Sequence, residues 1–198
     1  NYNRGTVTIA AAAGAGVKPD DVTFNSFGRL TYQGVDGQTI NRTGALNYGA
    51  GAVGEFGVDN TTATQTTDFV VNQNGLVTLG SGGTGASMRI LLADALTKMN
   101  LSGGVLLGGD SSISVANSAN RVLTIDSVIG DGGNGYDLTF NDDAGGWNQT
   151  NGIVRLTGLN TFTGDVTLSS GILEFDSVTN ASGGVSAPGT PGRRGWAP

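Results

Sequence analysis

The sequence predicts an all-β fold, a right-handed parallel β-helix (β-solenoid) of about eight irregular coils with one short amphipathic helix. The main observation is a recurring phrase in which a glycine precedes alternating apolar residues. Six copies occur, at Gly5–Ile9, Gly28–Tyr32, Gly75–Leu79, Gly104–Leu107, Gly152–Leu156 and Gly171–Phe175. Successive copies begin 23, 47, 29, 48 and 19 residues apart. Because two of these offsets are close to twice 24, a degenerate unit of about 24 residues fits the set.

Composition is the second observation. Charged residues make up 13% of the chain, about half the usual globular share, and the 198 residues include 35 Gly and 4 Pro. The glycines separate apolar-alternating runs instead of forming tracts, which favours an ordered fold over a flexible linker. We expect one solenoid domain over residues 1–185 and a Pro/Gly-rich tail over 186–198.

Each phrase reads as a strand that buries one face and exposes the other. Such a strand cannot bury its apolar face alone, whereas stacked coils enclose a continuous core. At the N-terminus the alternation of Thr6–Ile9 favours a strand and turn over a signal peptide. The apolar run Val7–Val17 is too short to span a membrane. A chain that starts at Asn1 without Met is expected to be a portion of a longer protein.

Residues 87–100 break this pattern and predict the helix. Their apolar residues recur at helical spacing: Met88, Leu91, Leu92, Ala95, Leu96 and Met99. Ser87 is placed to cap the helix, and Asp94 and Lys98 are one turn apart. We expect the helix to pack on the side or end of the solenoid, with partner binding as the alternative.

The segment Gly80–Gly85 formally matches the dinucleotide fingerprint G-x-G-x-x-G. The next candidate ribose-binding acid, Asp110, lies 30 residues after Gly80, later than the fingerprint requires, and no alternation of strands and helices follows. A linker loop is therefore preferred, and no cofactor is expected.

The absence of residue types excludes several chemistries. The chain has no Cys and no His, which excludes disulfides, Ser-His-Asp triads and zinc sites built on those residues. Its formal net charge of −6 provides no basic patch for nucleic acid.

Acidic residues in the C-terminal third leave two alternatives open. The segment Gly132–Asp137 begins like a calcium-binding nonapeptide, so Asp131, Asp137, Asp142 and Asp143 are candidate ligands, against a simpler role as turn residues.

A carbohydrate-active enzyme needs carboxylates or an Arg base and no histidine. Its candidate residues are Asp142, Asp143, Arg155 and Asp165, with Trp147 as a sugar-stacking platform.

The phrase Leu156–Gly164, LTGLNTFTG, followed by Val166–Leu168 and Ser170–Leu173, resembles the autotransporter-associated β-strand repeat of bacterial surface passengers. The close match covers about 24 residues. The resemblance implies a parallel β-helix that is exported across the outer membrane and acts as a stalk or scaffold, without catalytic residues. The translocator barrel of such proteins is missing from this sequence, so the export route is inferred.

We therefore predict a non-enzymatic, extracellular structural or adhesive protein of the bacterial cell surface. Its expected partners are further copies, joined end to end or laterally, or surface glycans and neighbouring surface proteins. The alternatives are a β-helix polysaccharide lyase or hydrolase and a β-sandwich pilin, which would have antiparallel neighbouring strands.

Overall fold

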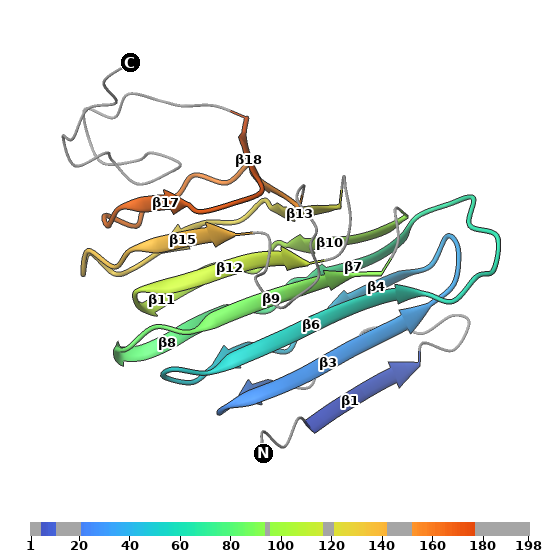
Figure 1. The fold of residues 1–198 in the computed structure, drawn as a ribbon, viewed down its shortest axis with the longest axis horizontal. Coiled ribbons are helices and arrows are strands. Elements are labelled where there is room, and N and C mark those ends of the chain that lie inside the picture. Colours follow the sequence, from blue (N-terminus) through green and yellow to red (C-terminus); the bar gives the residue numbers. More distant parts are fainter. Residues whose placement is uncertain (1–4, 11–20, 94–95, 117–120, 142–151, 177–198) are drawn as a thin grey trace.

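A computed structural model shows a β-solenoid with three parallel sheets (Figure 1). It describes residues 5–10, 21–93, 96–116, 121–141 and 152–176. The sheets are called A, B and C, and their strands are given below. Each full coil contributes one strand to sheet C, then one to sheet A and then one to sheet B. The described chain completes five such coils, with partial coils at both ends. The predicted parallel β-solenoid is confirmed, whereas the predicted eight coils are too many.

The three sheets are built from strands that follow one another along the stack. Sheet A contains β1 (Gly5–Ala10), β3 (Phe27–Gly34), β6 (Val53–Asn60), β9 (Ser87–Leu92), β12 (Ser111–Ala116), β15 (Leu138–Asn141) and β17 (Val166–Leu168). Sheet B contains β4 (Thr39–Arg42), β7 (Phe69–Gln73), β10 (Thr97–Leu101), β13 (Val122–Ile125), β16 (Ile153–Leu156) and β18 (Ile172–Phe175). Sheet C contains β2 (Val22–Phe24), β5 (Leu46–Tyr48), β8 (Val77–Gly83), β11 (Val105–Gly109) and β14 (Ile129–Gly130).

The strand register explains which of the repeat phrases are true neighbours. Gly5 pairs with Gly28, and Ile153 pairs with Ile172, as the offsets of 23 and 19 predict. Val77 pairs with Val105, one position from the predicted alignment. The offsets of 47 and 48 are wrong as repeat distances because they join phrases on different sheets. All named strand pairs among the described residues are parallel, which rules out the β-sandwich alternative for this part of the chain.

Coil length varies because the loops vary, so no fixed unit of 24 residues describes the coils. Glu55 bonds to Arg29, 26 positions earlier, and to Arg89, 34 positions later, in the adjacent coils. At the corner between sheets A and B, eight residues separate β6 from β7, whereas four residues, 35–38, separate β3 from β4.

The predicted helix over residues 87–100 is wrong. This segment forms β9 and β10, and Met88, Ile90 and Leu92 are the fully buried residues of β9. Met88 and Leu92 fit both periodicities, but a helix would leave Ile90 on its polar face, whereas the strand buries it. The neighbouring strands β6 and β12 supply backbone partners on both sides of β9, and this tertiary pairing decides the outcome. Lys98 pairs with Asp68 in the preceding coil, and Asp94 lies outside the described residues.

The interior is one apolar column that runs through all the coils. Aromatic rings stack within it, with 4.7 Å between the ring centroids of Phe24 and Tyr48. Gly54 makes room for this pair, because a Cβ atom at Gly54 would lie 2.3 Å from Cε1 of Tyr48. Within the described residues there is no helix long and apolar enough to cross a membrane.

Candidate functional site

The turn after β14 carries the candidate calcium motif, and Asp131 is its buried centre. Asp131 Oδ1 accepts a hydrogen bond from the Gly133 N–H at 2.8 Å. Its Oδ2 accepts from the N–H groups of Gly135, Tyr136 and Thr163 at 2.9, 3.2 and 3.0 Å, and from Thr163 Oγ1 at 3.0 Å. Burial acts to raise the pKa of Asp131, but these donors, led by the Thr163 N–H, hold it below the ordinary value of 3.8. The carboxylate therefore closes the turn and joins two coils.

Asp137 belongs to a different arrangement, a ladder of aspartates at the entrance to sheet A. The Asp137 N–H donates to Asp110 Oδ1 at 3.0 Å, and the Asp165 N–H donates to Asp137 Oδ1 at 2.8 Å. No group of three acidic side chains within the described ranges is arranged to hold a metal ion. Asp142 and Asp143, the remaining candidate ligands, lie outside these ranges.

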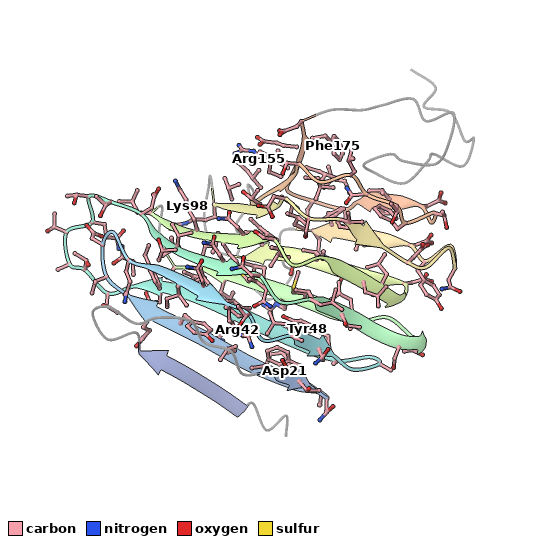
Figure 2. The ribbon with its side chains drawn as sticks, turned by 180° about the vertical axis from the view of Figure 1, so that it is seen from behind. Asp21, Arg42, Tyr48, Lys98, Arg155 and Phe175 are labelled. Carbon is pink, nitrogen blue, oxygen red and sulfur yellow. The ribbon has the colours of Figure 1, made fainter. Side chains whose placement is uncertain are left out.

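The candidate enzyme residues are not assembled into one site in the described structure. Arg155 lies on the outer face of β16, where its Nε and Nη2 donate to Glu174 Oε2 of the next coil at 2.8 and 2.7 Å. Asp165 lies in the aspartate ladder before β17, on another sheet. Trp147, like Asp142 and Asp143, lies outside the described residues. Figure 2 shows Arg155 near Phe175, toward the C-terminal end of the solenoid.

The G-x-G-x-x-G segment forms a tight turn within the solenoid. Ser81 and Thr84 exchange backbone hydrogen bonds of 2.9 and 3.0 Å, and the chain then enters β9. A pyrophosphate site of the fingerprint type needs the N-terminus of a helix at this point. Because a strand follows instead, the dinucleotide alternative does not apply.

A shallow groove of about 310 Å³ crosses several coils where sheet C turns into sheet A. Its lining consists of small residues, Gly51, Ala52, Gly85, Ala86, Ser87, Ser111 and Ser112, together with Asp110, Asp137 and Thr139. Gly85 lies close to the next coil, since a Cβ atom there would lie 1.6 Å from the Asp110 carbonyl oxygen. One carboxylate oxygen of each aspartate already accepts a backbone N–H of the next coil. The acids of the groove therefore serve coil stacking.

The outer face of sheet A carries a charged ladder. Glu55 is 1% exposed and lies between Arg29 and Arg89 of the adjacent coils. The Arg29 Nε donates to Glu55 Oε2 at 2.6 Å, and Arg89 Nη1 donates to Glu55 Oε1. In the same strands, Gln33 Nε2 donates to Asp59 at 3.1 Å. The charges of this face therefore bind neighbouring coils to each other.

The outer face of sheet B carries an amide ladder. Asn72 Nδ2 donates to Asn41 Oδ1 at 2.9 Å, and Asn100 Nδ2 donates to Asn72 Oδ1 at 2.8 Å. Stacked amides of this kind are typical of in-register parallel strands. These side chains, like the charges on sheet A, stabilise the stack.

A buried polar network ties sheet B to the corner that leads into sheet C. The Arg42 side chain is fully buried, and its Nε donates to Tyr32 Oη at 3.1 Å while its Nη1 donates to Gln73 Oε1 at 2.7 Å. Gln73 Nε2 donates to the carbonyl groups of Gly44 and Gly75, each at 2.8 Å. Burial raises the pKa of the nearby Tyr48 far above its ordinary range, against a smaller opposing effect of Arg42. Figure 2 shows Arg42 and Tyr48 together near the N-terminal end of the solenoid.

Sequence reasoning missed this network and both outer ladders. A single polar residue at an inward strand position, such as Arg42, looks the same in sequence as an outward one. The one available indication of the amide ladder was the spacing of Asn41, Asn72 and Asn100, and this spacing can be matched to successive coils only once the coil lengths are known.

Comparison with known proteins supports the autotransporter resemblance. The chain is 35% identical over 118 residues to the Adhesin BmaC autotransporter of Brucella suis biovar 1 (strain 1330). The match covers 57% of this chain but 3% of the adhesin, so the chain spans a very small part of that relative's length. No protein-family model matches the chain, and no solved structure gives a significant match. Together with the β-solenoid fold, this similarity confirms the resemblance predicted from the repeat phrase, and the relative is named as an adhesin, not as an enzyme.

Proposed function

We propose that this chain is a non-enzymatic structural or adhesive element of the bacterial cell surface, a β-solenoid stalk exported as part of an autotransporter-type passenger. The single observation that carries the proposal is the use made of the polar side chains. The ladders Arg29–Glu55–Arg89 and Asn41–Asn72–Asn100 both connect one coil to the next. A surface whose polar groups hold the stack together suits a rigid spacer.

The dimensions and chemistry of the chain also suit that role. Seven strands of sheet A stacked at about 4.8 Å give roughly 30 Å of rod. A solenoid of this kind extends by adding coils, without needing a larger core. With no Cys in the chain, the ladders and the apolar column supply stability that disulfides supply in many secreted domains. The similarity to an autotransporter adhesin supports surface exposure and adhesion.

Surface display tests the proposal. Residues 1–198 would be fused to an autotransporter translocator and expressed in a bacterium, with the translocator alone as the control. We expect protease added to intact cells to remove the passenger, and displaying cells to adhere to host-cell layers or to one another more than control cells do. A passenger that stays inside the cell would overturn the proposal, and a passenger that reaches the surface without any gain in adhesion would overturn its adhesive form and leave the structural one.

A further inference from the structure

A hollow of about 200 Å³ lies on the outer face of sheet A, at Gly57 of β6. The strands β3, β6 and β9 lie side by side here (Figure 1), and Gly57 pairs with Thr31 on one side and with Leu91 on the other. Because alternate residues of a strand point outward, Gly57 occupies the middle of a grid of outward positions and contributes no side chain to it. A Cβ atom at Gly57 would lie 2.7 Å from Thr31 Oγ1, so Thr31 leans toward the glycine and forms one wall of the hollow.

Arg29 lies at one end of the hollow. Its side chain is 40% exposed, and its Nε donates to Glu55. Its Nη1 and Nη2 groups make no hydrogen bond with any residue that the structure describes. The Glu55 carboxylate is buried and shared with Arg89, so it offsets the charge of Arg29 only in part. A guanidinium group with two free Nη groups binds a carboxylate through paired hydrogen bonds, so this end favours an anionic group.

Asp59 lies at the other end, and its Oδ2 accepts a hydrogen bond from Gln33 Nε2 at 3.1 Å. Asp59 Oδ1 and the Thr31 hydroxyl are unpaired within the described ranges. Both can accept hydrogen bonds from the hydroxyl groups of a ligand. Leu91 and Ala93 supply the apolar part of the lining. This combination suits a sugar, which has hydroxyl groups around its edge and C–H groups on its ring faces.

The spacing and lining of the hollow argue against other classes of ligand. Arg29 pairs with Glu55, four residues before Asp59, so the backbone positions of the two ends are about 14 Å apart. An amino acid, whose two charged groups share one carbon atom, is too short to reach both ends. None of the lining residues is aromatic, so a nucleotide base has no stacking partner. Because β6 is hydrogen-bonded on both sides, a peptide cannot add to it as a further strand.

We infer that this hollow binds an acidic sugar, a pyranose that carries a carboxylate. The carboxylate binds Arg29, a ring hydroxyl donates to Asp59 Oδ1, and the ring lies over Gly57 with its C–H groups toward Leu91. The chain has a net charge of −6 and repels anions in general, so binding of an acidic sugar depends on the local contact with Arg29. This inference goes beyond the proposed stalk role and does not depend on export.

Titration of the purified chain with glucuronate, followed by amide chemical shifts in NMR spectra, tests the site. We expect the amide signals of Gly57 and Leu91 to shift and to saturate with a dissociation constant of about 1 mM, the range for a ligand of this size in an open site. Glucose has the hydroxyl groups without the carboxylate, and acetate has the carboxylate without the ring. We expect each of them to bind at least about tenfold more weakly than glucuronate.

Three variants assign the contacts. Arg29→Lys keeps a positive charge beside Glu55 but loses the paired donors, and we expect it to weaken glucuronate binding about tenfold. Arg155→Lys is the matched control, because Arg155 is 44% exposed and pairs with Glu174 on the outer face of sheet B; its affinity should equal that of the wild type. Thr31→Val removes the hydroxyl with little change of shape and should weaken binding about threefold, which keeps the test decisive if Arg29→Lys reduces stability. Circular dichroism verifies the fold of each variant.

Several results would contradict the inference. Glucose that binds as tightly as glucuronate would show that Arg29 plays no part, and acetate or sulfate that binds as tightly would indicate a general anion site. Equal affinity of Arg29→Lys and Arg155→Lys for glucuronate would also overturn the inference, as would shifts confined to residues outside β3, β6 and β9. A negative result would leave the proposed stalk role unaffected, because these experiments use the purified chain and require neither export nor adhesion.

Discussion

Replacing Asp131 tests whether polar turns, and not a metal ion, hold the coils together. A hydrogen bond to a charged group contributes about 1.5 to 3 kcal/mol. The donors on Gly133 and Gly135 belong to exposed residues and regain water when the carboxylate is removed. The two bonds from Thr163, which join neighbouring coils, are the main loss. We therefore expect Asp131→Ala to lower the free energy of unfolding by about 3 kcal/mol.

Two variants with smaller expected losses serve as comparisons. Asp131→Asn keeps one acceptor oxygen for Thr163 and loses the bond from Gly133, so we expect a loss of about 1 to 2 kcal/mol. Asp126→Ala removes an exposed aspartate bonded to Ser102 Oγ and should cost less than about 0.5 kcal/mol. Urea denaturation followed by circular dichroism measures all three. A loss below about 0.5 kcal/mol for Asp131→Ala would refute the reasoning.

The pH dependence of stability provides a second readout of Asp131. Its pKa in the folded protein lies below 3.8, so its contribution is present above that pH and is lost as the pH falls through 3.8 toward the folded pKa. The pKa of Asp36 is also lowered, chiefly by the Asn60 side chain, and its contribution has the same sign. Asp131→Asn should therefore flatten, but not abolish, the decline in stability between pH 5 and pH 2.

Calcium should not change the melting temperature of the wild type. A rise in melting temperature that Asp131→Asn removes would assign the carboxylate to a metal site instead.

Four further variants test the packing and the ladders, each by urea denaturation. Gly54→Ala forces a Cβ atom against Tyr48 and should cost about 2 kcal/mol; a neutral effect would show that the ring has room to move. Glu55→Gln removes a buried charge between two arginines and should cost about 2 to 4 kcal/mol, whereas Glu174→Gln, in an exposed pair, should cost less than about 1 kcal/mol. Similar losses for these two glutamates would contradict the importance of burial. Asn72→Ala interrupts the amide ladder in its middle and should cost about 1 kcal/mol, and full stability would mean that water replaces the amide without loss.

The sequence predicted the fold class well because alternation and glycine punctuation are local signals. Gly28–Tyr32 lies within β3, and Ile172–Phe175, which follows Gly171, forms β18, as their alternation indicates. The number of coils was not predictable from the same signals. Loop length sets the coil length, and loops at the same corner that differ as much as residues 35–38 and 61–68 follow no common period.

The segment from Ser87 to Asn100 shows where local reasoning fails. Met88 and Leu92 fit both a helix and a strand, and only the partners on β6 and β12 decide between them. The same limit applies to function. The hollow at Gly57 depends on which residues the coils bring side by side, and Arg29, Gly57 and Leu91 lie too far apart in sequence to suggest a site.

The parallel register is the claim on which the ladders, the stalk and the hollow at Gly57 all depend. Through-hydrogen-bond couplings measured by NMR in a chain of 19.9 kDa test it directly. The structure predicts couplings from the Val77 N–H to the Gly104 carbonyl and from the Val105 N–H to the Val128 carbonyl. Couplings that pair these strands in the antiparallel sense, or their absence in a folded chain, would contradict the account.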